Sequence, residues 1–128
     1  MSMSKRAIHT PAAPEAIGPY SQAIVANGLI FVSGQLPIDR EGKLLTEIRA
    51  ATAQCLDNIK AILEAAGAEM DDLVKVTIYV TDLADFTAIN EVYAGYFTKE
   101  PPARAFVQVA ALPKGAPIEI EGIALKRS

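Results

Sequence analysis

The pattern of apolar and polar residues near the start of the chain predicts a β-hairpin. Residues 20–26 and 29–33 are mostly apolar and flank the dipeptide Asn27-Gly28. This dipeptide tolerates the two positive φ angles of a type I′ turn. The second segment is apolar at both alternating positions, which is typical of a strand covered on both sides. A further turn is predicted at residues 39–42, followed by at most a short strand at 43–45.

Two amphipathic helices are predicted after the hairpin. Residues 47–66 place apolar side chains at spacings of three and four, and residues 85–97 do the same with Phe86, Ile89, Tyr93 and Phe97. Thr46 is the expected N-cap of the first helix, and Gly67 stands where a left-handed residue often ends a helix. Asp82 or Asp85 is expected to cap the second.

Three strands are predicted around and after the second helix. Residues 73–80 alternate, with Val74 and the other even-numbered residues on the apolar face. Residues 103–110 follow two prolines, and residues 117–125 carry the alternating run IEIE. The apolar parity of this last strand changes after Gly122, which predicts a β-bulge at the glycine.

The order strands, helix, strand, helix, strands predicts an α/β (α+β) sandwich, a mixed sheet with both helices on one face. We expect a single domain over residues 1–128, in which residues 1–19 form an extended, proline-containing arm that carries an exposed His9. The other face of the sheet then lacks a cover. A second copy of the chain, in a closed oligomer, is the expected cover.

Composition narrows the classes of function. The chain has 51% hydrophobic residues, a formal charge of −3 and an estimated pI of about 5.1, with scattered cations, so we expect no nucleic-acid partner. With one His and one Cys, a metal site would have to consist of carboxylates, and no EF-hand spacing occurs, so we expect no metal. A single Cys also forms no internal disulfide. Cys55 falls on the buried stripe of the first helix, which favours a packing role over a reactive thiol. No signal peptide or membrane span is indicated, and the cytoplasm is the expected location.

One charge in an apolar segment indicates candidate chemistry. Arg104 stands in PPARAFVQV, and a buried guanidinium costs several kcal/mol unless an anion meets it. If the last two strands pair, Glu119 or Glu121 can approach it, and this arrangement would serve equally as a structural ion pair or as part of a site. Asn90 lies beside the apolar stripe of the second helix. Its amide either bonds to backbone or faces a ligand.

Six motifs, in the family's order, resemble the reactive intermediate deaminase family, RidA or YjgF-like proteins. They are AIGPYSQAI (16–24), FVSGQLPID (31–39), CLDNIKAILEAAG (55–67), VTIYVTDLADF (76–86), and PPAR with IEIEGIAL. The resemblance implies a homotrimer with a chorismate-mutase-like fold and ligand sites between subunits. It also implies hydrolysis of enamines and imines such as 2-aminoacrylate, 2-iminopropanoate and 2-iminobutanoate to 2-keto acids and ammonia, without cofactor or metal.

The resemblance also implies roles for residues that match its motifs. Arg104 would hold the substrate carboxylate in a two-point fork, and Glu119 would polarise the attacking water. Tyr20 would be a third catalytic residue, whose phenol hydrogen-bonds to substrate or water. Substrate contacts are implied for Ser33, Gly34 and Asn90. Many family members have cysteine where this chain has Phe106, so Phe106 is expected to alter pocket volume and substrate preference. The loop TKEPPAR before Arg104 also looks shorter than in archetypal members.

Two other functions stay open from the sequence. The first is an endoribonuclease or translation inhibitor, which the acidic pI disfavours and salt-sensitive RNA binding would support. The second is a non-catalytic module that binds small carboxylates, or a chaperone-like holdase. Such a protein would bind 2-keto acids without hydrolysing an imine, and Glu119→Gln would leave its activity intact.

Overall fold

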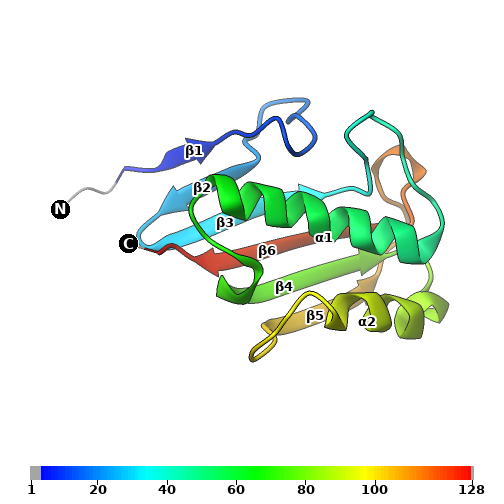
Figure 1. Ribbon diagram of the computed structural model, residues 1–128. Coiled ribbons are helices and arrows are strands. Elements are labelled where there is room, and N and C mark those ends of the chain that lie inside the picture. The colour runs from blue at the N-terminus through cyan, green and yellow to red at the C-terminus, as the bar shows by residue number, and fades with distance from the viewer. Residues whose placement is uncertain (1–3, 128) are drawn as a thin grey trace.

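A computed structural model describes residues 4–127. Figure 1 shows a mixed sheet with both helices on the same face, which confirms the predicted α+β class. The strand order is β1-β2-β3-β6-β4-β5, in which β4 and β5 are parallel and the other neighbours antiparallel. The elements are β1 (Arg6–Ile8), β2 (Ala23–Ala26), β3 (Leu29–Gln35), α1 (Ile48–Ala65), β4 (Leu73–Val80), α2 (Phe86–Ala94), β5 (Ala103–Gln108) and β6 (Ile118–Leu125).

The core lies between the sheet and the two helices. The predicted stripe of α1 is buried, and so are alternate residues of β4 and β6. Each such aliphatic side chain contributes about 1.5–3 kcal/mol when it is fully buried. The fully buried large residues include Ile30, Leu56, Ile59, Ile62, Leu63, Ile78, Ile89, Ile118 and Ile120. Within residues 4–127, no helix has the length and apolar character needed to cross a bilayer.

The hairpin turn and the end of α1 are as predicted, but the cap of α1 is not. Asn27 and Gly28 both have positive φ, and Gly67 has a φ of 82° just beyond the helix. The N-cap is Glu47, not Thr46, because the Glu47 carboxylate accepts hydrogen bonds from the backbone N–H groups of Arg49 and Ala50. A carboxylate there also interacts favourably with the positive end of the helix dipole.

Helix α2 is shorter than predicted. A 3-10 turn, η2 (Leu83–Asp85), precedes it, and the Asp82 carboxylate accepts from the Ala84 N–H at the start of that turn. The helix stops at Ala94 with Gly95 as its C-cap. Beyond the helix, the Tyr96 hydroxyl donates to the carbonyl of Ala53 on α1.

The predicted bulge at Gly122 is wrong. Along β6 the buried face continues unbroken through Gly122 and Ala124. The irregularities lie on the two neighbouring strands instead, between Leu73 and Lys75 of β4 and between Val32 and Gln35 of β3. The β4 bulge explains why Leu73 is buried while Val74 is 40% exposed, contrary to the predicted face. An added Cβ at position 122 would lie 2.8 Å from Leu73 Cδ2, so a larger residue there would displace the Leu73 side chain.

The extended arm is fastened to the sheet more tightly than the sequence suggested. Part of it forms the edge strand β1, which pairs with β2, while residues 1–3 of the predicted arm lie outside the described residues. The buried Gln22 holds the segment after β1. Its amide donates to the carbonyls of Thr10, Ala13 and Pro14, and its carbonyl accepts from the Thr10 N–H at 2.7 Å. His9 is exposed, as predicted.

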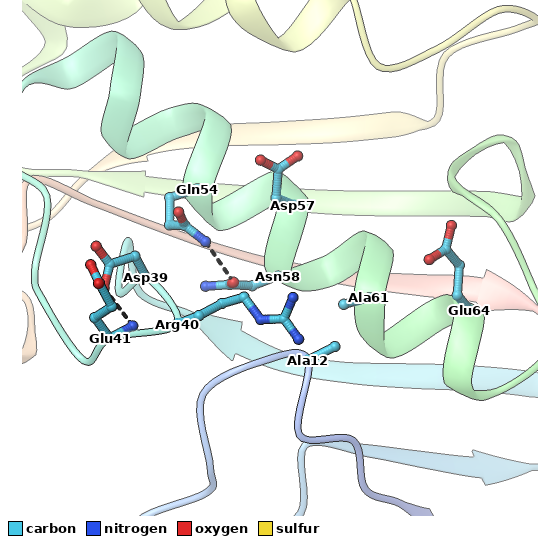
Figure 2. A pocket seen from close by; sticks show the side chains of 9 residues that line it. All are labelled: Ala12, Asp39, Arg40, Glu41, Gln54, Asp57, Asn58, Ala61 and Glu64. Carbon is cyan, nitrogen blue, oxygen red and sulfur yellow. Dashed lines mark hydrogen bonds between the residues drawn. The ribbon is translucent and has the colours of Figure 1, made fainter.

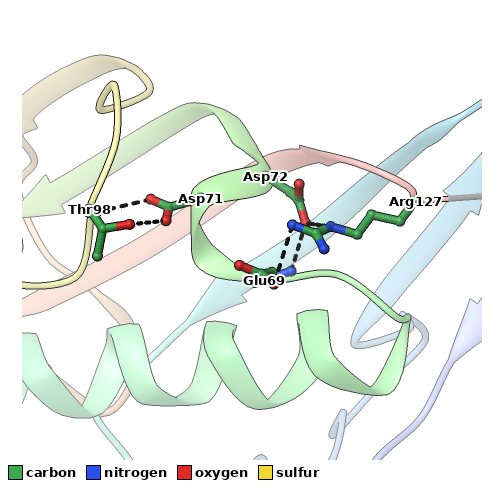
Figure 3. Close-up of polar contacts among 5 residues, drawn as sticks. All are labelled: Glu69, Asp71, Asp72, Thr98 and Arg127. Atoms are coloured by element: carbon green, nitrogen blue, oxygen red, sulfur yellow. Dashed lines mark hydrogen bonds and ion pairs between the residues drawn. The ribbon is translucent and has the colours of Figure 1, made fainter.

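A second 3-10 turn, η1 (Met70–Asp72), fastens the C-terminal segment (Figure 3). Arg127 donates from Nε to Asp72 at 2.9 Å and pairs with Glu69 at 3.2 Å. On the other side of the turn, Asp71 accepts from the side chain and the N–H of Thr98, and these hydrogen bonds lower the pKa of Asp71. The start of β1 and the end of β6 lie at the same end of the sheet, because antiparallel pairings connect β1 to β6 through β2 and β3 (Figure 1).

Candidate functional site

Arg104 lies between β5 and α2, on the helix-covered face of the sheet. It is on this face because it pairs with Val76 of β4, whose side chain is fully buried in the core. Arg104 Nη1 donates to Asn90 Oδ1 at 2.8 Å. Among residues 4–127, no Asp or Glu forms an ion pair with this guanidinium. The partly buried cation therefore has an amide partner but no counter-charge in its own chain.

Three aromatic rings surround the same guanidinium. Its central carbon lies 4.9 Å from the ring centroid of Tyr93, 5.3 Å from that of Phe106 and 5.8 Å from that of Phe86. Each such contact contributes about 0.5–1 kcal/mol where the cation is exposed and more where it is desolvated. The rings restrict the side chain without using its N–H donors. We call Phe86, Asn90, Tyr93, Arg104 and Phe106 the arginine half-site.

Glu119 lies on the opposite, open face of the sheet. It pairs across strands with Tyr79, while its neighbours Ile118 and Ile120 point into the core. Glu119 lines a cavity of about 910 Å³, whose walls include the arm and the loop after β3. Four predicted site residues and Glu121 line this cavity together. We call these five the glutamate half-site: Tyr20, Ser33, Gly34, Glu119 and Glu121.

Gly34 brings the Glu119 carboxylate against the backbone of β3. A Cβ at position 34 would lie 2.2 Å from Glu119 Oε2, closer than any real contact, so only glycine leaves room for the carboxylate. The bulge in β3 includes this residue. Beside it, Ser33 Oγ donates to the carbonyl of Ser21 at 2.6 Å, which fixes the hydroxyl and leaves its lone pairs as acceptors. Tyr20 at the mouth of the cavity is 52% exposed.

The glutamate half-site carries two carboxylates on one strand face. Burial raises the pKa of Glu119, and the nearby charge of Glu121 raises it further. Burial is also the main cause that raises the pKa of Tyr79. The charge of Glu121 and a hydrogen bond with the Glu121 side chain raise the pKa of Tyr79 further. A carboxylate whose pKa lies above the ordinary value is a better proton acceptor when ionised, which suits general base chemistry.

The predicted site residues therefore form two groups in one chain. Asn90, Arg104 and Phe106 belong to the arginine half-site, and Tyr20, Ser33, Gly34 and Glu119 to the glutamate half-site. The expected approach of Glu119 or Glu121 to Arg104 is wrong for a single chain, because β5 and β6 do not pair. Strand β4 lies between them, and β5 joins it in parallel after the α2 crossover.

Sequence reasoning missed three contributors to this arrangement. Phe86 and Tyr93 had been predicted only as core residues of α2, yet their rings lie against the Arg104 guanidinium. The hydroxyl of Tyr93 is buried without a hydrogen-bond partner, and burial raises the pKa of Tyr93 to about 12. Gln22 was not assigned a role, although a glutamine at the start of an apolar strand is itself a signal of a buried polar contact.

A separate cavity of about 510 Å³ lies between α1, the arm and the turn at residues 39–42 (Figure 2). None of the predicted site residues lines it. Asn58 lines this cavity and connects α1 to the loop after β3. Its amide donates to the carbonyls of Leu36 and Ile38 and accepts from the Gln54 side chain. In the part of the chain that the structure describes, no group of three His, Cys, Asp or Glu side chains is placed to hold a metal ion.

The chain is similar to known proteins along nearly its whole length. Residues 10–126 match the family described as Endoribonuclease L-PSP. A RutC family protein of Pyrococcus abyssi is 52% identical over 97% of this chain and 99% of its own length. The 2-iminobutanoate/2-iminopropanoate deaminase of Escherichia coli is 46% identical over 98% of this chain and 100% of its own length. A crystal structure of E. coli TdcF with bound serine is 42% identical, with a TM-score of 0.92 over 96% of this chain and 99% of that one.

Proposed function

The chain belongs to the Endoribonuclease L-PSP family, which includes the YjgF/RidA proteins, and on this basis we propose that it hydrolyses 2-imino acids to 2-keto acids and ammonia. The observation that carries the proposal is the unpaired cation of the arginine half-site, whose rings and amide partner leave N–H donors for an anionic ligand. A relative 46% identical to this chain is named for this reaction.

Arg104 binds the substrate carboxylate in this proposal. A planar guanidinium holds a carboxylate at two points, which fixes the direction of the carbon next to it. Asn90 occupies Nη1 and thereby sets the orientation of the remaining donors. The related TdcF structure with bound serine supports a small carboxylate as ligand, since serine carries the same group.

Glu119 acts as the general base and proton carrier in this proposal. Its carboxylate accepts a proton from a water molecule while the water oxygen bonds to the carbon of the protonated imine, giving a carbinolamine. Glu119 returns the proton to nitrogen, and the C–N bond breaks as ammonia leaves with the bonding electron pair. As the C=O bond forms, the carbinolamine hydroxyl gives its proton to Glu119, which passes it to the departing ammonia. The balance is one protonated imine and one water to one 2-keto acid and one ammonium ion.

The active assembly is proposed to be a homotrimer with sites between protomers. Arg104 and Glu119 lie on opposite faces of one continuous sheet, so motion of their side chains cannot bring them to the same ligand. An arginine half-site of one protomer and a glutamate half-site of its neighbour can together provide both groups. Exposed apolar side chains on the open face, including Phe31, Val107 and Leu125, offer a surface for association.

A coupled assay tests the proposed reaction. A serine dehydratase supplies 2-aminoacrylate from serine, and lactate dehydrogenase reports pyruvate; added protein is expected to raise the initial rate of pyruvate release in proportion to its concentration. Arg104→Met serves as the inactive control. If the rate equals that without protein while 2-keto acids still bind, the chain is a carboxylate-binding module and the catalytic proposal is wrong.

A further inference from the structure

Two of the rings beside Arg104 form an apolar wall that the proposed chemistry does not use. Phe86 and Phe106 pack edge to face, with ring centroids 4.8 Å apart and an interplanar angle of 64°. Phe86 is 43% exposed, and Leu83 in the preceding turn is 49% exposed. We call Phe86 and Phe106 the aromatic wall.

The place of the wall in the fold puts it within reach of a ligand on Arg104. Phe106 is two residues from Arg104 along β5 and points to the same face, since their partners on β4 are Ile78 and Val76. Its ring centroid lies 5.3 Å from the guanidinium carbon, and that of Phe86 lies 5.8 Å away. A ligand that binds Arg104 through its carboxylate carries its side chain on the next carbon. A side chain of three or four carbons is about as long as these distances, so it can reach the rings from there.

From this geometry we infer that the protein favours 2-imino acids with large apolar side chains, such as those derived from leucine or phenylalanine, over 2-iminopropanoate. This inference rests on the proposed function and on the carboxylate lying at Arg104. Packing an aliphatic or aromatic group on the rings removes apolar surface of both from water. Aromatic rings also pair favourably with one another at such centroid distances.

The experiment compares two imines made in place by an amino acid oxidase, one from alanine and one from leucine. Semicarbazide and the protein compete for the imine. The decrease in the rate of semicarbazone formation with added protein therefore reports the kcat/KM for hydrolysis of that imine. The wild-type protein is expected to favour the leucine-derived imine about tenfold, the lower end of what one added methylene contributes in an apolar pocket, since the rings are partly exposed. Phe106→Ala is expected to reduce this preference to about twofold or less, by weakening hydrolysis of the larger imine more.

Phe86→Ala tests the same wall with a more exposed residue, so a folding defect in one variant does not decide the result. Tyr96→Phe is the matched control, since Tyr96 bonds to Ala53 and Asp57 and lies outside the arginine half-site. Its preference should equal that of the wild type. Equal or better hydrolysis of the alanine-derived imine, or an unchanged preference in both wall variants, overturns the inference and points to a second copy covering the rings. Hydrolysis of neither imine instead overturns the proposed function.

Discussion

The arginine and glutamate half-sites differ in the sign of the charge that each leaves unbalanced. Arg104 is a partly buried cation with an amide and three rings around it but no carboxylate. Glu119 is a half-buried carboxylate whose nearest charged neighbour on the strand, Glu121, has the same sign and raises its pKa. Each half-site therefore lacks what the other provides. The difference is the basis of the proposal that one ligand site combines both half-sites.

The half-sites are also supported by different means. The arginine half-site stands on a helix and a strand, and aromatic packing limits its side chain. The glutamate half-site stands on β6, the bulged strand β3 and the arm. The missing side chain of Gly34 makes room for the carboxylate, and Gln22 holds the arm in place. The geometry of the arginine half-site is thus sensitive to changes in side-chain packing. The geometry of the glutamate half-site is sensitive to changes in backbone position.

The largest expected effects come from removing each charge in turn. Arg104→Met is expected to lower kcat/KM about 10³-fold or more, and Glu119→Gln to lower kcat about 10²- to 10⁴-fold. Unfolding and refolding the two variants together in equal amounts should restore about one quarter of wild-type activity, the fraction of random neighbour pairs with both native groups in a closed trimer. Each variant refolded alone is the control. If no activity is recovered, both groups act within one chain, and the conclusion that neighbouring protomers supply them is wrong.

Gln22→Leu is expected to lower the free energy of unfolding by about 2–4 kcal/mol, because it leaves a buried N–H and several carbonyls unpaired. Denaturant titration measures the loss, and hydrogen exchange should show faster exchange at Thr10, whose N–H bonds to Gln22. Gln54→Leu removes a single side-chain bond and should cost less. Equal losses in both variants would show that the arm is held by other contacts.

Gly34→Ala tests whether the backbone at Gly34 sets the position of the Glu119 carboxylate in the glutamate half-site. The added methyl displaces the Glu119 carboxylate, so kcat is expected to fall about 10- to 100-fold, an effect of about 1.4–2.7 kcal/mol on the barrier. In a Glu119→Gln background the same change should cause little further loss of activity. Gly95→Ala is the matched control, since its added Cβ would meet only Val92 O at an ordinary 3.5 Å. Additive losses would separate Gly34 from Glu119.

The smallest expected effect is a displacement of the pH profile. In the proposed mechanism Glu119 acts in its ionised form, so the rate should fall as the pH drops through its pKa, and the raised pKa places this limb at higher pH. Glu121→Gln removes one cause of the raised pKa, so the acid limb should move to lower pH with less than about a twofold rate change at pH 8. Glu91→Gln, which alters an exposed ion pair with Arg49, should leave the limb in place. A limb that moves to higher pH would contradict the assigned direction.

Much of the fold could be predicted because its signals are local. The Asn27-Gly28 turn, the stripe of α1 and the alternation of β4 depend on neighbours in sequence. The cap at Glu47 and the bulges beside Gly122 could not be predicted, since they depend on which groups of other residues compete for the same space. The parity change after Gly122 reflects Ile123 and Leu125, which lie on the open face of β6 together with Glu119 and Glu121.

The site residues were proposed from motifs, but their grouping required the topology. An Arg and a Glu on consecutive strands suggest a pair only if those strands are neighbours, and here β4 separates them. The motifs imply a substrate contact for Gly34, and the structure adds that a Cβ at this position would crowd the Glu119 carboxylate. The rings of Phe86 and Tyr93 looked like core residues because aromatic contact with a cation leaves no separate mark in the sequence.

The shared end of the sheet at which β1 begins and β6 finishes has a practical consequence. Three strand spacings of about 4.8 Å separate them, so a short flexible linker can join the chain end to its beginning. New termini could then be opened at the exposed Asp39–Gly42 turn, giving a circularly permuted protein. The same linker, placed between successive copies, would yield a tandem polypeptide in which the order of native and altered units is set by the gene.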